Sequence, residues 1–119
     1  AFEELYAPNV VYQHPGVGTL EGAQGLAEYV RDLRAQYPDL LITIEELIYD
    51  GDNLVCHWRF KGTDKGMHAA SELPPTGKQV DFHGADVMHL KDGKIVEDYV
   101  YFDQMAVMQQ LGLVEPFGA

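Results

Sequence analysis

Residues 80–103, VDFHGADVMHLKDGKIVEDYVYFD, predict two long antiparallel strands that fold back on each other at Asp92-Gly93. Asp-Gly between alternating apolar residues is a strong hairpin signal, because glycine accepts a positive φ. The length of the loop decides which residues share a face. A two-residue loop pairs even positions of the first strand with odd positions of the second, whereas a three-residue loop with Gly93 as a bulge pairs even with even.

The hydrophobic pattern favours the three-residue loop, because this register collects the apolar residues on one face. Asp86 and Asp98 then lie opposite each other within that face. Burial and like charge both disfavour ionised carboxyl groups, so at least one pKa is expected to be raised, as in proton-transfer sites. Alternatively, water or the cations Arg59 and Lys61 neutralise the pair. The predicted face comprises Val80, Phe82, Gly84, Met88, Leu90, Val96, Val100 and Phe102.

The composition indicates one acidic domain. The chain has 119 residues, enough for a single core, and 19 acidic against 8 basic residues give a formal net charge of −11. This charge argues against nucleic acid and anionic membranes as partners. No membrane span or signal peptide is expected from the apolar runs or the N-terminal pattern. The lone cysteine, Cys56, excludes an intrachain disulfide and fits a reducing compartment, so we expect a cytoplasmic protein.

The rest of the chain predicts an α+β pattern. Leu26, Tyr29 and Leu33 recur at helical spacing and make residues 23–36 the clearest helix. We expect one domain over residues 1–119, in which helices cover one face of a curved antiparallel sheet. The other predicted elements are the end of a helix at residues 2–6, strands at 10–14, 40–49 and 54–61, a loop at 62–77, and a helix at 104–111 that is capped by Asp103.

Five sequence blocks carry a family resemblance: LYAPNVVYQHPG at residues 5–16, LEG at 20–22, YPDL at 37–40, PPTGKQV at 74–80 and DGKIVE at 92–97. Together they resemble the SnoaL-like polyketide cyclase (ester cyclase-type) family over nearly the whole chain. The resemblance implies the cone fold shared with nuclear transport factors, ketosteroid isomerase, scytalone dehydratase and limonene epoxide hydrolase. In this fold a curved sheet wraps around helices and encloses one apolar pocket. The resemblance also implies an N-terminal helix that we expect to be truncated in this sequence.

The resemblance also implies a modified set of polar groups. The family's pocket histidine falls on Asp86, its neighbouring glutamine on Gly84, and the acid of the aldol-type cyclases on Val100, which cannot move a proton. Asp98 lies one inward position before Val100 and is expected to substitute for that acid. The ketosteroid isomerase pattern places its basic aspartate at His14 and its hydrogen-bonding aspartic acid close to Asp86.

We therefore predict an enzyme that acts on a hydrophobic cyclic or polyketide-like molecule by acid–base proton transfer, in a cyclisation, isomerisation or dehydration. The predicted catalytic residues are His14 as the base, with Asp86 and Asp98 as acids or hydrogen-bond donors. The predicted substrate-binding residues are Tyr12, Tyr29, Trp58, Phe82, Met88, Val100 and Phe102.

Two alternatives remain open from the sequence. Val100 and Gly84 stand where relatives hold functional groups, which favours a non-catalytic protein that binds a hydrophobic ligand. An epoxide hydrolase would need Arg59 between two acids. No cofactor is expected. No metal centre is expected either, because His57, His68, His83 and His89 show no metal-ligand spacing. The aromatic outer face of the hairpin, around Tyr99 and Tyr101, predicts a homodimer interface.

Overall fold

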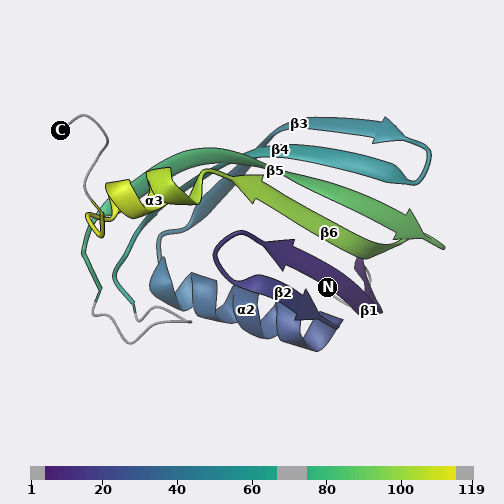
Figure 1. Ribbon diagram of the computed structural model, residues 1–119, viewed down its shortest axis with the longest axis horizontal. Coiled ribbons are helices and arrows are strands. Elements are labelled where there is room, and N and C mark those ends of the chain that lie inside the picture. Colours follow the sequence, from purple (N-terminus) through teal and green to yellow (C-terminus); the bar gives the residue numbers. More distant parts are fainter. Residues whose placement is uncertain (1–4, 67–74, 115–119) are drawn as a thin grey trace.

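A six-stranded mixed sheet curves over two helices in the computed structural model, which describes residues 5–66 and 75–114 (Figure 1). The strand order is β2-β1-β6-β5-β4-β3. The single-domain α+β fold predicted from the sequence is confirmed, with one parallel pair in an otherwise antiparallel sheet. The elements are β1 Tyr6–His14, β2 Gly18–Glu21, α2 Ala23–Gln36, β3 Leu41–Asp50, β4 Asn53–Thr63, β5 Gln79–Lys91, β6 Lys94–Phe102 and α3 Gln104–Gln110.

The turn of the β5–β6 hairpin differs from the prediction. Lys91 pairs with Lys94, so Asp92 and Gly93 form a two-residue loop, and the three-residue loop is wrong. Both loop residues have positive φ, 53° for Asp92 and 79° for Gly93. Two consecutive left-handed residues make the turn whose twist matches that of paired strands.

The predicted even-with-even register is nevertheless confirmed along most of the hairpin. The pairing changes between Leu90↔Ile95 and His89↔Glu97, which leaves Val96 as an extra residue on β6. This bulge shifts the register by one and turns Ile95 into the core in place of Val96. The hydrophobic pattern therefore predicted correctly which residues share a face, whereas the predicted pairing of Asp86 with Asp98 is off by two positions and the extra residue lies three positions after Gly93.

The two acids share one face but do not face each other directly. Asp86 pairs with Val100, and Met88 pairs with Asp98, so the carboxyl groups are diagonal neighbours on β5 and β6. Diagonal positions of an antiparallel pair remain within reach of each other's side chains. The two carboxyl groups therefore still lie close together in one site, although they are not directly opposite each other.

The N-terminal segment adds two strands at the other side of β6. β1 runs parallel to β6, with Tyr12 opposite Asp98, and β2 returns antiparallel to β1. β2 was not predicted. Leu5 is helical, as predicted, but Tyr6 begins β1 rather than ending the helix. The remaining part of the predicted helix end, residues 2–4, lies outside the described residues.

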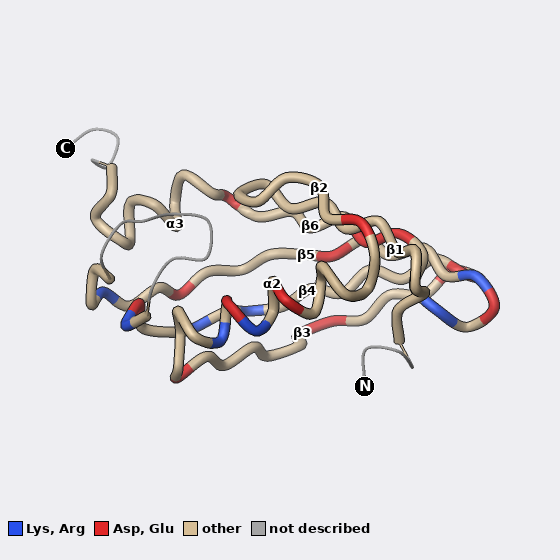
Figure 2. Tube along the Cα trace, turned by 90° about the horizontal axis from the view of Figure 1, so that it is seen from below, with Lys and Arg blue, Asp and Glu red and all other residues tan. Residues whose placement is uncertain are grey.

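The helices close the concave side of the sheet. α2 has the predicted bounds and buries Leu26, while residues of both charges follow one another along its length (Figure 2). α3 begins after Asp103, whose Oδ1 accepts a hydrogen bond of 3.1 Å from the Ala106 N–H, so the predicted N-cap is confirmed. Neither described helix is long and apolar enough to cross a membrane.

The buried residues form two apolar clusters, one at each end of the sheet. The first packs Val10 and Leu26 against β4, β5 and β6; the second joins Tyr37 and Phe60 to α3. Partly buried Trp58 packs against both clusters and so connects them. The space between the helices and the sheet is therefore bounded by apolar side chains from every layer.

Candidate active site

A cavity of about 550 Å³ lies between α2, α3 and the concave face of the sheet. This volume is within the usual range for small-molecule sites. Apolar and aromatic side chains form most of its wall, including Val107 from α3 and Leu111 at the C-cap of this helix. Met88 and Asp98 are buried behind this wall and do not line the cavity. Eight of the predicted site residues do line it: Tyr12, His14, Tyr29, Trp58, Phe82, Asp86, Val100 and Phe102.

Asp86 places a carboxyl group in this apolar wall. Its neighbours across the sheet are Cys56 on β4 and Val100 on β6. The indole Nε1–H of Trp58 donates a hydrogen bond of 2.8 Å to Asp86 Oδ1. Burial raises the pKa of Asp86, because the charged form loses hydration, while the hydrogen bonds from Asp98 and Trp58 act in the opposite direction. Asp86 therefore presents a poorly hydrated, oriented carboxyl group to the cavity.

Asp98 lies behind Asp86 and is completely buried. The Tyr6 hydroxyl donates to its Oδ2 at 3.4 Å, whereas Oδ1 accepts no hydrogen bond from any described residue. Burial, the hydrogen bond with Asp86 and the charge of Asp86 all raise the pKa of Asp98. These conditions favour a protonated Asp98 that donates its proton to the Asp86 carboxylate. The pair then carries one negative charge, located on the side of the cavity.

Gly84 allows Trp58 to reach Asp86. The two residues are paired directly across β4 and β5, and the Trp58 ring lies against the glycine backbone. A Cβ at position 84 would lie well inside van der Waals contact with Cη2 and Cζ2 of this ring and 2.9 Å from the Tyr101 carbonyl oxygen. The absence of a side chain at position 84 is thus a packing requirement of the Trp58–Asp86 hydrogen bond.

Gly84→Ala is expected to displace the Trp58 ring and lower the free energy of unfolding by about 1–3 kcal/mol, as overpacking does. The chain has a single tryptophan, so its fluorescence spectrum reports the displacement directly. Gly25→Ala is the matched control: nothing lies within 4 Å of an added Cβ there, and alanine should stabilise α2 by about 0.5–1 kcal/mol. An unchanged spectrum and unchanged stability in Gly84→Ala would contradict this packing requirement.

His14 is held by the turn that follows β1. Its Nδ1 accepts hydrogen bonds from the backbone N–H groups of Gly16, at 2.9 Å, and Val17, at 3.2 Å. Its Nε2 lies 3.0 Å from the Tyr29 hydroxyl oxygen. Because Nδ1 is an acceptor, the neutral ring carries its proton on Nε2 and donates it to Tyr29. Burial lowers the pKa of His14 to about 4, so the ring is neutral at pH 7.

These contacts favour a donor role for His14 over the predicted role as base. The ring is oriented by backbone N–H groups and by Tyr29, and neither Asp86 nor Asp98 orients it. Burial and the charge of Asp86 raise the pKa of Tyr29 to about 12, so its hydroxyl keeps its proton. Tyr29 accepts from His14 and retains a free O–H to donate, and such a chain strengthens the terminal donor.

The sequence as a whole also matches the model of a known protein family. The model of the SnoaL-like polyketide cyclases matches residues 1–111. The chain belongs to the SnoaL-like polyketide cyclase family. No curated protein sequence matches the chain significantly.

Solved structures agree with the SnoaL-like assignment. A candidate polyketide cyclase from Acidithiobacillus ferrooxidans is 31% identical, covers 95% of this chain and 81% of its own length, and has a TM-score of 0.75. A candidate SnoaL-like polyketide cyclase from Jannaschia sp. CCS1 is 25% identical over 95% of this chain and 77% of its own, with a TM-score of 0.84. A protein from Catenulispora acidiphila with a ketosteroid isomerase-like fold is 19% identical over 91% and 77%, with a TM-score of 0.74, and shares the fold.

Arg59 does not take part in the SnoaL-like cavity. It lies on the opposite side of the sheet, where its Nε and Nη2 donate to the two carboxylate oxygens of Asp81 at 2.8 and 2.7 Å. The epoxide hydrolase alternative required Arg59 between two cavity acids, and this placement contradicts it. The same placement rules out neutralisation of Asp86 and Asp98 by Arg59.

Sequence reasoning missed one member of this SnoaL-like site and one cluster that lies outside it. Tyr6, the hydrogen-bond donor to Asp98, was assigned to a helix; the tyrosine-alanine pattern Tyr6-Ala7 was the available signal. It also missed Glu45, which the structure brings close to His57 and His83 on the outer face. The predicted dimer surface stays a prediction, and Tyr101 within it is 60% exposed.

Proposed function

We propose that this SnoaL-like protein is an enzyme that binds a hydrophobic cyclic or polyketide-like molecule and transfers a proton on it. Asp86 carries the proposal, because a base with little hydration in an apolar cavity is suited to removing a proton from carbon. Asp98, which lies behind Asp86, contributes by holding a proton that it shares with the Asp86 carboxylate. The product class, whether of a cyclisation, an isomerisation or a dehydration, depends on the substrate that occupies the cavity.

The second half of the mechanism stabilises the charge that develops on the substrate. When Asp86 removes a proton next to a carbonyl group, negative charge moves to the carbonyl oxygen. The Tyr29 hydroxyl, backed by the His14 Nε2–H, supplies a fixed donor for that oxygen. A preorganised donor in a cavity with little water is typically the largest single contribution to such catalysis. Asp86 then returns the proton to the substrate as the charge leaves the carbonyl oxygen.

Hydrogen–deuterium exchange detects proton transfer whatever the final product is. A panel of polycyclic ketones and β-dicarbonyl aromatic compounds is first screened for binding by the fluorescence of Trp58, which contacts Asp86. Bound compounds are then incubated with the protein in D₂O, and exchange at the carbon next to the carbonyl is followed by NMR. We expect catalysed exchange for at least one bound compound. Binding of several compounds without catalysed exchange of any would contradict the proposal.

Non-catalytic ligand binding is the second candidate function. Val100, which lines the cavity directly across from Asp86, favours it, because the family's acid falls at this apolar position. The exchange experiment separates the two functions: a pure carrier binds the same compounds and quenches Trp58 but leaves their exchange rates at the buffer value.

A further inference from the structure

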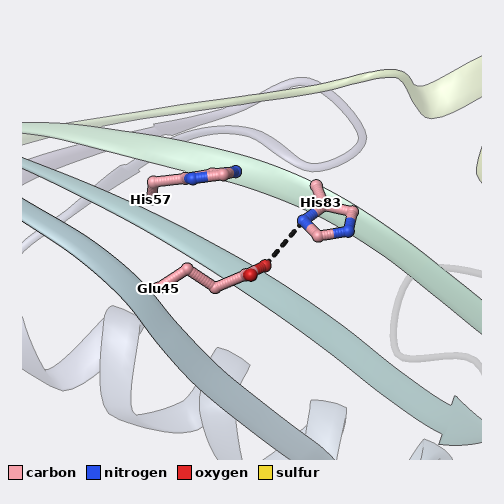
Figure 3. Close-up of side chains that lie close together, drawn as sticks. All are labelled: Glu45, His57 and His83. Atoms are coloured by element: carbon pink, nitrogen blue, oxygen red, sulfur yellow. Dashed lines mark ion pairs between the residues drawn. The ribbon is translucent and has the colours of Figure 1, made fainter.

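Three potential metal ligands meet on the outer face of the sheet, on the side opposite the cavity. Glu45 comes from β3, His57 from β4 and His83 from β5, and all three side chains extend toward one another (Figure 3). In the β4–β5 register His83 pairs with Arg59, two positions from His57, so the two histidines are diagonal neighbours on one face. Their ring centroids are 5.6 Å apart.

A bulge in β3 brings the carboxylate to this face. Ile44 pairs with Trp58 and Glu46 pairs with His57, which leaves Glu45 as an extra residue without a partner position on β4. Simple alternation would send one of the two adjacent glutamates into the cavity. The bulge instead leaves both on the outer face, where Glu45 Oε1 lies 2.8 Å from His83 Nδ1.

The distances suit a small divalent ion. One ligand atom from each residue lies within 4.8 Å of the other two. An ion at the centre of such a triangle is at most about 2.8 Å from each atom, compared with roughly 2.0–2.2 Å in zinc sites. Side-chain rotations that move each ligand atom by less than about 1 Å are enough to reach the zinc distance. The groups are also accessible: the side chains of His83 and Glu45 are 52% and 37% exposed.

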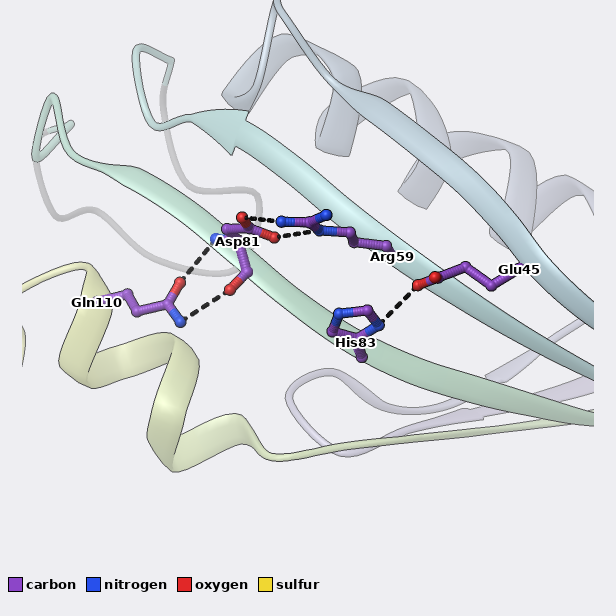
Figure 4. Close-up of polar contacts among 5 residues, drawn as sticks. All are labelled: Glu45, Arg59, Asp81, His83 and Gln110. Atoms are coloured by element: carbon purple, nitrogen blue, oxygen red, sulfur yellow. Dashed lines mark hydrogen bonds and ion pairs between the residues drawn. The ribbon is translucent and has the colours of Figure 1, made fainter.

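Neighbouring side chains orient the ligands and neutralise the nearby positive charge of Arg59. Glu46 Oε1 lies 3.2 Å from His57 Nδ1, which leaves Nε2 of this ring available. A carboxylate behind a ligating histidine fixes the ring and raises its basicity. The neighbouring cation, Arg59, is bound through two hydrogen bonds to Asp81, and Gln110 holds the Asp81 backbone from α3 (Figure 4).

We propose that Glu45, His57 and His83 form a binding site for a divalent transition-metal ion of the Zn²⁺ class. Two imidazoles and one carboxylate are a ligand set that zinc accepts, with the remaining coordination positions filled by water. The ion ties β3, the edge strand of the sheet, to β4 and β5. Because the site is on the outer face, it acts independently of the cavity and of the proton transfer proposed there.

Zinc titration of the protein, with any affinity tag removed, tests the site. Isothermal titration calorimetry should show one Zn²⁺ ion per chain, and Co²⁺ should give a visible absorption band from a site of low coordination number. We expect Glu46→Gln to weaken Zn²⁺ binding by about tenfold, as the loss of a carboxylate behind a ligand does. His83→Gln and His57→Gln, which remove ligands, should weaken it more.

His89→Gln is the matched control. His89 lies on the same strand and the same face as His83, and its Nδ1 is 2.7 Å from the Asn53 side-chain oxygen. Its loss should leave Zn²⁺ affinity unchanged. Zn²⁺ should also raise the melting temperature of the wild type and of His89→Gln, but not of the double variant His57→Gln/His83→Gln. Absent binding, or equal affinity in wild type and the double variant, overturns the proposal.

Discussion

Asp86→Asn is expected to lower catalysed hydrogen–deuterium exchange by about 10²-fold or more while ligands still bind, because an amide cannot take up the proton. The size and shape of the side chain are retained, and Asn Oδ1 can still accept from Trp58 Nε1. The variant should therefore remain folded, and the cavity should keep its volume. Exchange is measured by NMR with the compounds that bind the wild type, and affinity by Trp58 fluorescence.

Asp103→Asn is the control for this experiment. It makes the same chemical change outside the cavity wall, at the N-cap of α3, where asparagine caps as well as aspartate. Its exchange rates should equal those of the wild type. Retention of exchange by Asp86→Asn, with thermal unfolding unchanged, would move the base elsewhere and refute the role of Asp86. If Asp86→Asn loses both ligand binding and exchange, Asp86 acts in ligand binding and not as the base.

Asp98→Asn is expected to remove a pH dependence of stability. The raised pKa of Asp98 means that the folded chain holds a proton that the unfolded chain has released above about pH 4. The contribution of this proton to the free energy of unfolding is therefore fully present below that pH. It is lost as pH rises toward the folded-state pKa, by up to about 1.4 kcal/mol per pH unit. Asparagine remains neutral and can donate to Asp86, so the variant should be more stable than the wild type at alkaline pH.

The pH range of this measurement matters, because His14 acts in the opposite direction. Its pKa is lowered to about 4 by burial, so His14 costs stability as pH falls from about 6.5 through 4. Urea unfolding is therefore compared between pH 7 and 9, where His14 is neutral in both states. Asp50→Asn, at the exposed end of β3, should keep the wild-type slope. A wild-type stability that is flat over this range contradicts a proton held by Asp98.

The elements set by local pattern were predictable from the sequence. The bounds of α2 follow from apolar residues at helical spacing, and Asp103 is a residue type that caps helices by its own side chain. The inward face of the hairpin was also predictable, because burying one face of a strand selects a single register. Trp58 was placed on the correct face of β4 for the same reason.

The remaining features depend on where one extra residue falls or on contacts between distant segments. Val96 and Glu45 are bulges, and alternation alone does not say which residue of a strand becomes the extra one. His57 and His83 meet only through the β4–β5 register, so spacing along the chain gave no sign of them. The tautomer of His14, on which its proposed role as a donor depends, is set by backbone N–H groups of a turn and could not be predicted from the sequence.

The parallel pairing of β1 with β6 has a consequence for folding. Tyr6 and Asp98, which it brings together, are 92 positions apart in the chain. Closing so long a loop costs chain entropy before any contact compensates for it, and topologies of this kind fold slowly. During synthesis, β1 can pair with β2 early, but it cannot pair with β6 until β6 has left the ribosome. Asp98 can therefore be covered by Tyr6 only after nearly the whole chain has been made.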